Sequence, residues 1–147
     1  MDIQGEVIAI GSDHAGYELK NAVIKHLDDI GVKYINLGCL DGSSCDYPVV
    51  AREVCAKITD GTVKLAILVC GTGIGISIAA NKINGIRAAV CTDAYTAKYT
   101  RLHNDANVLC LGGRVTGPGV AEEMVDIFLS TDFEGGRHER RVSLIEN

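Results

Sequence analysis

The stretch LAILVCGTGIG, residues 65–75, decides the fold of this 147-residue chain. Its first five residues are all apolar, which is typical of a strand that is buried on both faces. Glycines follow directly, and residues 74–82 continue in a pattern that favours a helix. A strand, a glycine-rich turn and a helix in this order indicate a parallel α/β sheet.

Strand-like and helix-like segments alternate in the same way over the rest of the chain. We expect further strands at residues 7–11, 32–37, 86–91 and 108–111. We expect further helices at residues 19–30, 48–58, 95–103 and 120–129, with a last helix from Arg137. The pattern predicts one domain over residues 1–147: a three-layer α/β/α sandwich, Rossmann-like, around a five-stranded parallel sheet. For the strand order we predict 2-1-3-4-5, the common flavodoxin-like arrangement.

The composition is that of an ordinary globular protein, with 47% hydrophobic and 22% charged residues. A net charge of −5 with 14 Lys and Arg residues gives no basic surface for nucleic acid. The N-terminal residues lack the features of a signal peptide, and no stretch approaches the roughly 18 apolar residues of a membrane span. The six cysteines contain no C-x-x-C pair, so a zinc ribbon is disfavoured. We therefore expect a cytoplasmic protein that binds neither nucleic acid nor membranes.

Ligands of parallel α/β sheets bind beyond the carboxyl ends of the strands. The expected strand ends carry Asp13–His14, Cys70–Gly75, Thr92–Asp93 and Gly112–Arg114. Glycines at 71, 73 and 75 let the backbone point several N–H groups at one spot, where a helix N-terminus adds positive character. The loop therefore predicts an anion hole, with a plain glycine-rich turn as the alternative. A dinucleotide fingerprint is excluded because Ile76 stands where the third glycine belongs, and no P-loop is present.

Several single residues carry a functional and a structural interpretation side by side. Cys70, at a helix N-terminus, is either an activated base or a small buried apolar residue. Asp13 either binds sugar hydroxyls and moves protons, together with His14, or caps the following helix. His103, beside Asn104, either works as an acid–base group or lies exposed on a loop.

The tail contains a basic cluster. Arg137 and Arg141 are i and i+4, so both guanidinium groups lie on one face of a helix and suit a phosphate dianion. Arg114, after the last expected strand, is a candidate to join them. The alternative is a solvated charged tail.

Together these segments resemble the type B ribose-5-phosphate isomerase family, which also includes galactose-6-phosphate and allose-6-phosphate isomerases. The segments that carry the resemblance are GSDHAGYELK from Gly11, DYP at 46–48, CGTGIGISIAANK at 70–82, GIRAAVC at 85–91, RLHNDANVL at 101–109, LGGRV at 111–115 and EGGRHERRV at 134–142. They cover nearly the full length of the chain in order.

The resemblance implies an aldose–ketose isomerase that acts through an enediolate without metal or cofactor. Cys70 resembles the base that moves a proton between C1 and C2, and Ile76 occupies the place of the Glu that other subgroups use. His103 resembles the group that opens the sugar ring, with Asp13 assisting. Thr72 is similar to the hydroxyl that contacts the sugar oxygens.

The substrate-binding set implied by the resemblance spans most of the chain. Its members are Asp13, His14, Tyr47, Gly71, Thr72, Gly73, Ile74, Gly75, Asn104, Arg114, Arg137 and Arg141. The implied partner is a second copy of the chain, in a homodimer with shared active sites, with pairing of dimers into a tetramer left open. Two other functions also stay open, isomerisation of a six-carbon sugar phosphate such as allose 6-phosphate and a non-catalytic sugar-phosphate sensor.

Overall fold

Five strands form one all-parallel sheet in the computed structural model, which describes residues 5–146. The strands are β1 (Val7–Ser12), β2 (Lys33–Gly38), β3 (Ala66–Cys70), β4 (Ala88–Val90) and β5 (Val108–Gly112). The helices are α1 (Tyr17–Ile30), α2 (Tyr47–Thr59), α3 (Ile74–Asn81), α4 (Ala94–Asn104), α5 (Pro118–Ser130) and α6 (Arg137–Ile145). The predicted strands and helices are therefore all present.

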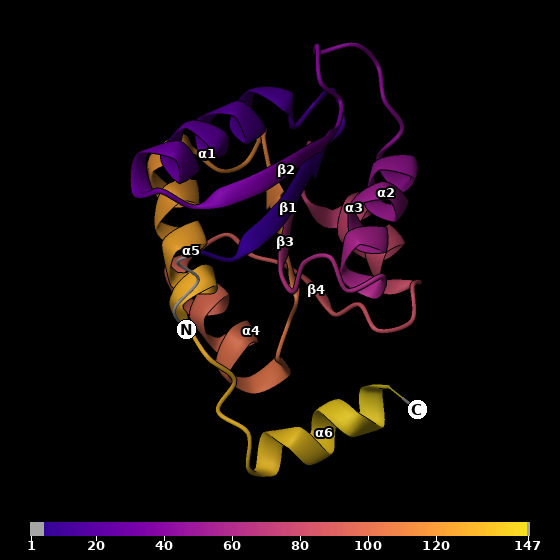
Figure 1. Ribbon diagram of the computed structural model, residues 1–147, viewed down its shortest axis with the longest axis vertical. Coiled ribbons are helices and arrows are strands. Elements are labelled where there is room, and N and C mark those ends of the chain that lie inside the picture. The colour runs from indigo at the N-terminus through magenta and orange to yellow at the C-terminus, as the bar shows by residue number, and fades with distance from the viewer. Residues whose placement is uncertain (1–4, 147) are drawn as a thin grey trace.

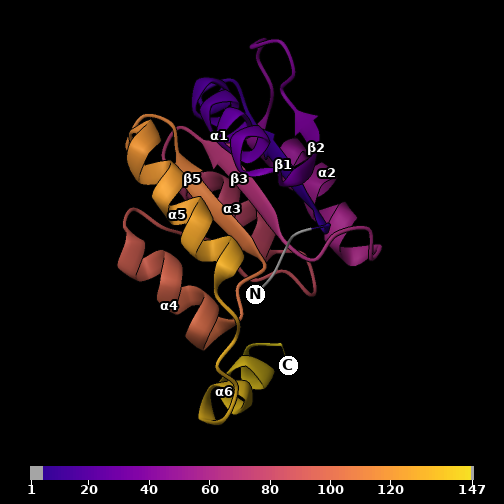
Figure 2. The same cartoon turned by 60° about the vertical axis from the view of Figure 1, so that its left-hand side comes forward.

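Helices cover both faces of the sheet, as Figures 1 and 2 show. All five residues of β3 are buried, and they alternate between two hydrophobic cores. Ile67 and Val69 pack in the core shared with α1 and α5, whereas Leu68 and Cys70 pack in the core shared with α2 and α3. This alternation confirms the predicted three-layer sandwich and explains why β3 has no polar residue.

The predicted strand order was wrong at one edge of the sheet. The order is β2-β1-β3-β5-β4, so β5 lies between β3 and β4. β5 has five residues, all buried, whereas β4 has three residues that are only partly covered. The longer, fully apolar strand takes the interior position because it buries more apolar surface there, and the short strand forms the edge.

The direction of α4 determines where its last residues lie. α4 starts after the carboxyl end of β4, where Asp93 accepts a hydrogen bond from the N–H of Thr96 at 2.7 Å. The helix then runs back along the sheet and ends at its amino edge. α6 packs beside that end of α4, where Arg87 forms an ion pair of 2.6 Å with Glu146 (Figure 2).

No helix within residues 5–146 has the length and apolar character needed to cross a membrane.

Candidate active site

The loop after β3 places a thiol beside the N-terminus of α3. Cys70 is the last residue of β3 and is 4% exposed. Its sulfur accepts a hydrogen bond from the backbone N–H of Gly73 at 3.1 Å. An N–H group that points at the sulfur, together with the helix N-terminus, stabilises negative charge at this position.

Glycine is required at position 73 for two reasons. Its φ is +81°, a left-handed conformation that side chains disfavour. A Cβ there would lie 2.8 Å from Cγ2 of Val90 and 3.0 Å from the carbonyl carbon of Leu111. The loop is therefore pressed against β4 and β5, which fixes the direction of its amides.

Three strand ends meet around this loop, as the sequence predicted. The N–H of Gly113 donates to the carbonyl of Cys70 at 2.7 Å, and the N–H of Arg114 donates to the carbonyl of Gly71 at 3.0 Å. Seen from Gly71, the nearest side chains are those of Ala15 and Arg114. The loops after β1, β3 and β5 thus form one surface with a guanidinium group on it.

Asp13 and His14 lie in the loop after β1. Asp13 is buried, and its Oδ1 accepts the N–H of Gly16 at 3.0 Å. One carboxylate oxygen therefore closes the turn before α1, but Asp13 is not the predicted helix cap, because the N-cap residue of α1 is Gly16 and no side chain caps the helix. His14 is exposed, and its Nδ1 lies 3.3 Å from both the backbone nitrogen and the carbonyl oxygen of Cys45.

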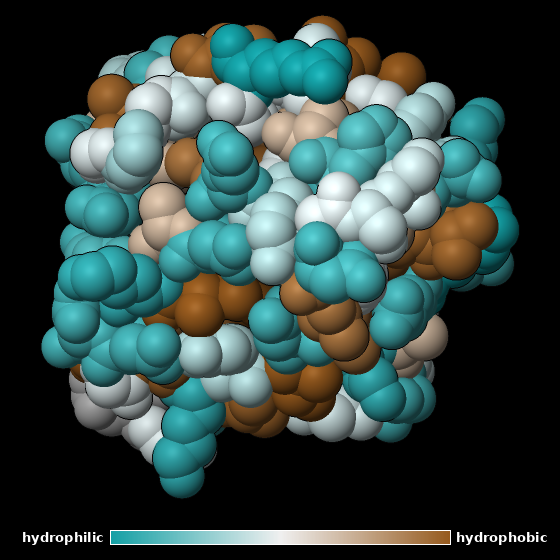
Figure 3. Space-filling view, turned by 90° about the horizontal axis from the view of Figure 1, so that it is seen from above, coloured by the Kyte–Doolittle hydropathy of each residue, from teal (hydrophilic) through white to brown (hydrophobic). Residues whose placement is uncertain are grey.

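Tyr47 and Thr72 complete this part of the surface. The ring of Tyr47 lies 2.9 Å from the point where a Cβ on Gly75 would sit, so only glycine leaves room for it. Oγ1 of Thr72 accepts the N–H of Ile74 at 3.1 Å. Figure 3 views this side of the molecule, toward which β1 and β2 run, and hydrophilic residues cover most of it.

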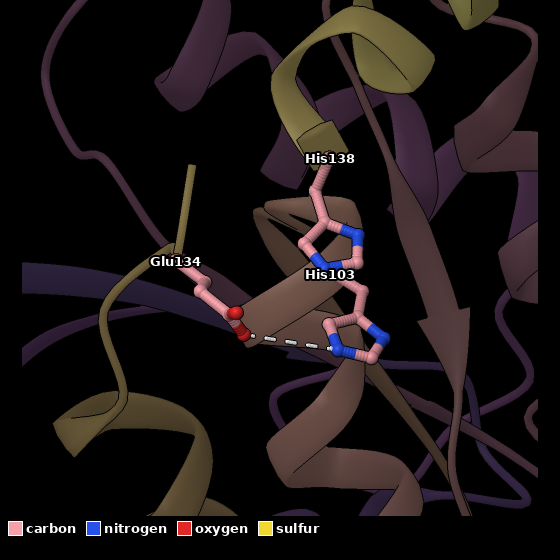
Figure 4. A group of neighbouring side chains, drawn as sticks. All are labelled: His103, Glu134 and His138. Atoms are coloured by element: carbon pink, nitrogen blue, oxygen red, sulfur yellow. Dashed lines mark ion pairs between the residues drawn. The ribbon is translucent and has the colours of Figure 1, made fainter. Parts of the chain in front are cut away.

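A second group of candidate residues lies at the C-terminal end of α4. Figure 4 shows His103 with Glu134 and His138. Nε2 of His103 is 3.8 Å from Oε2 of Glu134, and the rings of His103 and His138 stack with centroids 4.0 Å apart at 13°. A groove of about 310 Å³ runs along α4 and reaches His103 and Asn104.

His138 is the buried member of this group. Within residues 5–146 its Nε2 has no hydrogen-bond partner. Burial lowers the pKa of His138 from its ordinary value, and the nearby charges of His103 and Arg137 lower it further. The neutral form of the imidazole is therefore favoured beside the ring of His103.

The side chains of His103, Glu134 and His138 offer three ligand atoms within 4.8 Å of one another. A metal ion binds an imidazole nitrogen about 2 Å away, along the lone pair in the plane of the ring. The lone pairs of two stacked, nearly parallel rings lie in separate, nearly parallel planes, so they do not converge on one ion. As arranged here, the cluster orients His103 and does not form a chelate.

Sequence reasoning assigned no role to Glu134 or His138. A signal was nevertheless present, because both lie in the segment 134–142 that carried the resemblance. His138 directly follows Arg137, and its burial on α6 required knowledge of how that helix packs on α4.

The predicted site residues thus form two groups at opposite edges of the sheet. Cys70 and the loops around it lie at the carboxyl edge, while His103, Asn104, Arg137 and Arg141 lie at the amino edge (Figures 1 and 2). α4, whose 11 residues span about 16 Å at 1.5 Å per residue, runs from one edge to the other. Arg137 and Arg141 do share the predicted helix, but Arg114 does not join them within one chain.

Comparison with known proteins identifies the family. Residues 8–145 match the family described as "Ribose/Galactose Isomerase". "Ribose-5-phosphate isomerase B" of Escherichia coli K12 is 48% identical over 138 residues, which cover 94% of this chain and 93% of that protein. The solved structure of ribose-5-phosphate isomerase B from Clostridium thermocellum superposes with a TM-score of 0.93 at 48% identity, covering 95% of both chains. That of Thermotoga maritima gives 0.94 at 47% identity, covering 96% and 97%.

This chain therefore belongs to the ribose/galactose isomerase family. Its class of activity is the aldose–ketose isomerisation of a sugar phosphate. The resemblance inferred from the sequence and the predicted α/β fold are both confirmed.

Proposed function

We propose that this chain interconverts D-ribose 5-phosphate and D-ribulose 5-phosphate through an enediolate, with Cys70 as the base. The buried thiol between the end of β3 and the start of α3 carries the proposal. A general base typically contributes about 100- to 10,000-fold to the rate of proton transfer. The printed names of the relatives, ribose-5-phosphate isomerase B, support the pentose phosphate as substrate.

The amides of the loop can stabilise the enediolate oxygen, but they are not all free to do so. The N–H of Gly73 is bonded to the Cys70 sulfur, and that of Ile74 is bonded to Thr72. The first amides of a helix have no partner within the helix, which leaves the N–H of Gly75 as a donor. We assign the oxyanion to the N–H groups of Gly71 and Gly75, with Gly73 serving the base.

The remaining roles require the group around His103 to lie next to the loops around Cys70. We propose that His103 opens the furanose ring with help from Asp13, and that Thr72, Tyr47 and Asn104 contact the sugar. The phosphate is held by a separate set of cationic side chains. These are His14, Arg114, Arg137 and Arg141. Every proton and charge in this scheme comes from protein groups, so the proposal includes no cofactor.

A second copy of the chain can bring the two groups together, because one copy holds them at opposite edges. We propose a homodimer in which each site takes Cys70 from one subunit and His103 from the other. Exposed apolar side chains on α3 and in the first turn of α4 support an interface beside the Cys70 group. Ile74 and Ile78 on α3 and Tyr95 on α4 are 53%, 57% and 70% exposed. Such a patch on a small protein is typical of a contact surface.

Turnover of ribose 5-phosphate by the wild type and by Cys70→Ala tests the function, with allose 6-phosphate run alongside. We expect the wild type to prefer the pentose phosphate, and Cys70→Ala to bind it while losing at least about 100-fold in kcat. A wild type that prefers allose 6-phosphate would be a six-carbon isomerase. A wild type that binds both sugars and converts neither would be a sensor, and the role given to Cys70 would be wrong.

Mixing two inactive variants tests the shared site. Cys70→Ala and His103→Asn each disable both sites of a homodimer. In a mixed dimer one site receives Cys70 and His103 intact, from different subunits. Random exchange should therefore restore about a quarter of wild-type activity, since half the dimers are mixed and half their sites are intact. No recovery after verified subunit exchange would place both residues of a site in one chain.

A further inference from the structure

The loop between β2 and α2, residues 39–46, brings two cysteines together. The thiol of Cys39 donates to the carbonyl of Ser43 at 2.8 Å, and the thiol of Cys45 donates to the same oxygen at 3.4 Å. Both sulfur atoms therefore lie around one carbonyl oxygen, and the nearness of Cys39 raises the pKa of Cys45. Neither cysteine has a role in the isomerase scheme.

A tight turn holds both thiols against the carbonyl oxygen of Ser43. Gly42 has φ +81°, and the N–H of Ser43 donates to Oδ1 of Asp41 at 3.0 Å. The hydroxyl of Tyr17 fixes the turn from outside by donating to the carbonyl of Leu40 at 3.2 Å. Residues 39–46 contain no helix or strand, so a small movement here disturbs no regular hydrogen bonding.

A buried cation lies beside the pair. The side chain of Lys20 is fully buried, and its ammonium group donates to the carbonyl of Cys39. Burial lowers the pKa of Lys20, and interaction with Cys39 and Cys45 raises it in part, so the ammonium lies close enough to both thiols to interact with them. Cys45 is half-buried whereas Cys39 is 1% exposed, so a small oxidant reaches the pair from the side of Cys45.

We propose that Cys39 and Cys45 are an oxidation site that closes to a disulfide with peroxide and thereby weakens substrate binding. One thiolate attacks a peroxide oxygen, the O–O bond breaks, hydroxide leaves and a sulfenic acid forms. The other thiolate attacks that sulfur, the S–S bond forms, the S–O bond breaks and a second hydroxide leaves. The two thiols lose two protons and two electrons, and the peroxide is reduced to two waters.

Formation of the disulfide should displace residues of the candidate active site. Sulfur atoms in a disulfide are about 2 Å apart, closer than two unbonded sulfur atoms lie, so Cys45 must move toward Cys39. The backbone of Cys45 contacts Nδ1 of His14, and Tyr47 follows two residues later with its ring against Gly75. The loss of binding rests on the proposed function, which assigns His14 and Tyr47 to the substrate.

Peptide mapping tests the disulfide itself. The Cys70→Ala protein, which lacks the thiol assigned as the base, is treated with hydrogen peroxide, alkylated and digested with trypsin. Residues 34–52 form one tryptic peptide that contains both Cys39 and Cys45. We expect this peptide to lose two hydrogens, to resist alkylation and to regain both thiols on reduction. Cys55, whose pKa burial raises to about 11, is the internal control and should stay reduced.

Two mapping results would overturn the proposal. In one, both cysteines of peptide 34–52 are alkylated after peroxide treatment. In the other, Cys45 carries sulfinic acid and no link to Cys39, which would mean that Cys39 does not reach it. Neither result depends on enzyme activity, so the mapping stands even where no isomerase activity is found.

Kinetics test the effect on the site. Peroxide should raise KM for ribose 5-phosphate about three- to tenfold, the effect of one lost hydrogen bond, and reduction should reverse it. Cys45→Ser should show no change in KM under the same treatment. Direct oxidation of Cys70 would lower kcat in both the wild type and Cys45→Ser. It is thereby distinguished from the disulfide, which should change KM in the wild type alone. An oxidised wild type with an unchanged KM would overturn the coupling, and an inactive reduced wild type would instead overturn the proposed function.

Discussion

Substitution of Gly73 by alanine tests the geometry of the glycine loop most directly. The left-handed conformation, with φ +81°, costs alanine about 1–2 kcal/mol. The new Cβ also meets Cγ2 of Val90 at 2.8 Å and the carbonyl carbon of Leu111 at 3.0 Å. The valine can rotate but the backbone carbon cannot, so the loop must shift, and overpacking of this kind adds about 1–3 kcal/mol.

Gly61→Ala is the matched control. Gly61 has φ +84°, and a Cβ there meets nothing within 4 Å. The control therefore carries the conformational cost alone, about 1–2 kcal/mol, without the clash and far from Cys70. The difference in unfolding free energy between the two variants measures the close approach of the loop to β5.

The same shift should reduce activity. The N–H of Gly73 holds the Cys70 sulfur at 3.1 Å, so a displaced loop misplaces the base and the neighbouring amides together. Loss of one oxyanion donor typically lowers kcat about 100- to 1000-fold, and we expect a fall of that size in Gly73→Ala. Urea unfolding and steady-state isomerisation of both variants give the two quantities. A Gly73→Ala protein with wild-type kcat, destabilised no more than Gly61→Ala, would refute this reasoning.

Two further predictions concern charged groups away from the loop. The ammonium of Lys20 donates to three oxygens, one of them Oδ1 of Asn36 at 2.9 Å, so Lys20→Met should destabilise the fold by about 2–4 kcal/mol in urea unfolding. The exposed Lys25→Met should change it by less than about 0.5 kcal/mol, and equal effects would contradict the assigned role. Because burial and His103 lower the pKa of His138, the unfolded chain takes up a proton first as the pH falls, and stability is lost as the pH drops through about 6.5. Thermal melts should show a weaker loss for His138→Asn, and an identical pH dependence would exclude this source.

The helices and strands were predictable because the pattern of apolar residues within a single segment indicates which of its faces are buried. The run at residues 65–69 is buried on both faces. Five consecutive apolar residues are too few for a typical helix, so the run indicates a strand that is covered on both sides. Strand order depends instead on a comparison between segments. Both segments are apolar, and the sequence predicted the longer strand at 86–91. In the structure that strand is limited to Ala88–Val90, whereas β5 has five residues, all buried.

The candidate site was predictable where it depends on strand ends. The loops after β1, β3 and β5 meet because parallel strands end at the same edge, a rule that needs no side-chain detail. His103 lies in the last turn of α4, and a helix that starts at the carboxyl edge returns its last turn to the amino edge. The direction of α4 alone thus separates His103 from Cys70. The stacking of His103 on His138 depends on how α6 packs and has no counterpart in a sequence pattern.

The length of α4 has a consequence for how the enzyme responds to dilution. A single chain carries both halves of the proposed site but holds them a helix length apart, so it completes none by itself. In the homodimer proposed above, mass action makes protein concentration a variable of catalysis. Specific activity should stay constant while subunits are paired and fall in proportion to the paired fraction once they separate, with each chain still folded and its thiol in place.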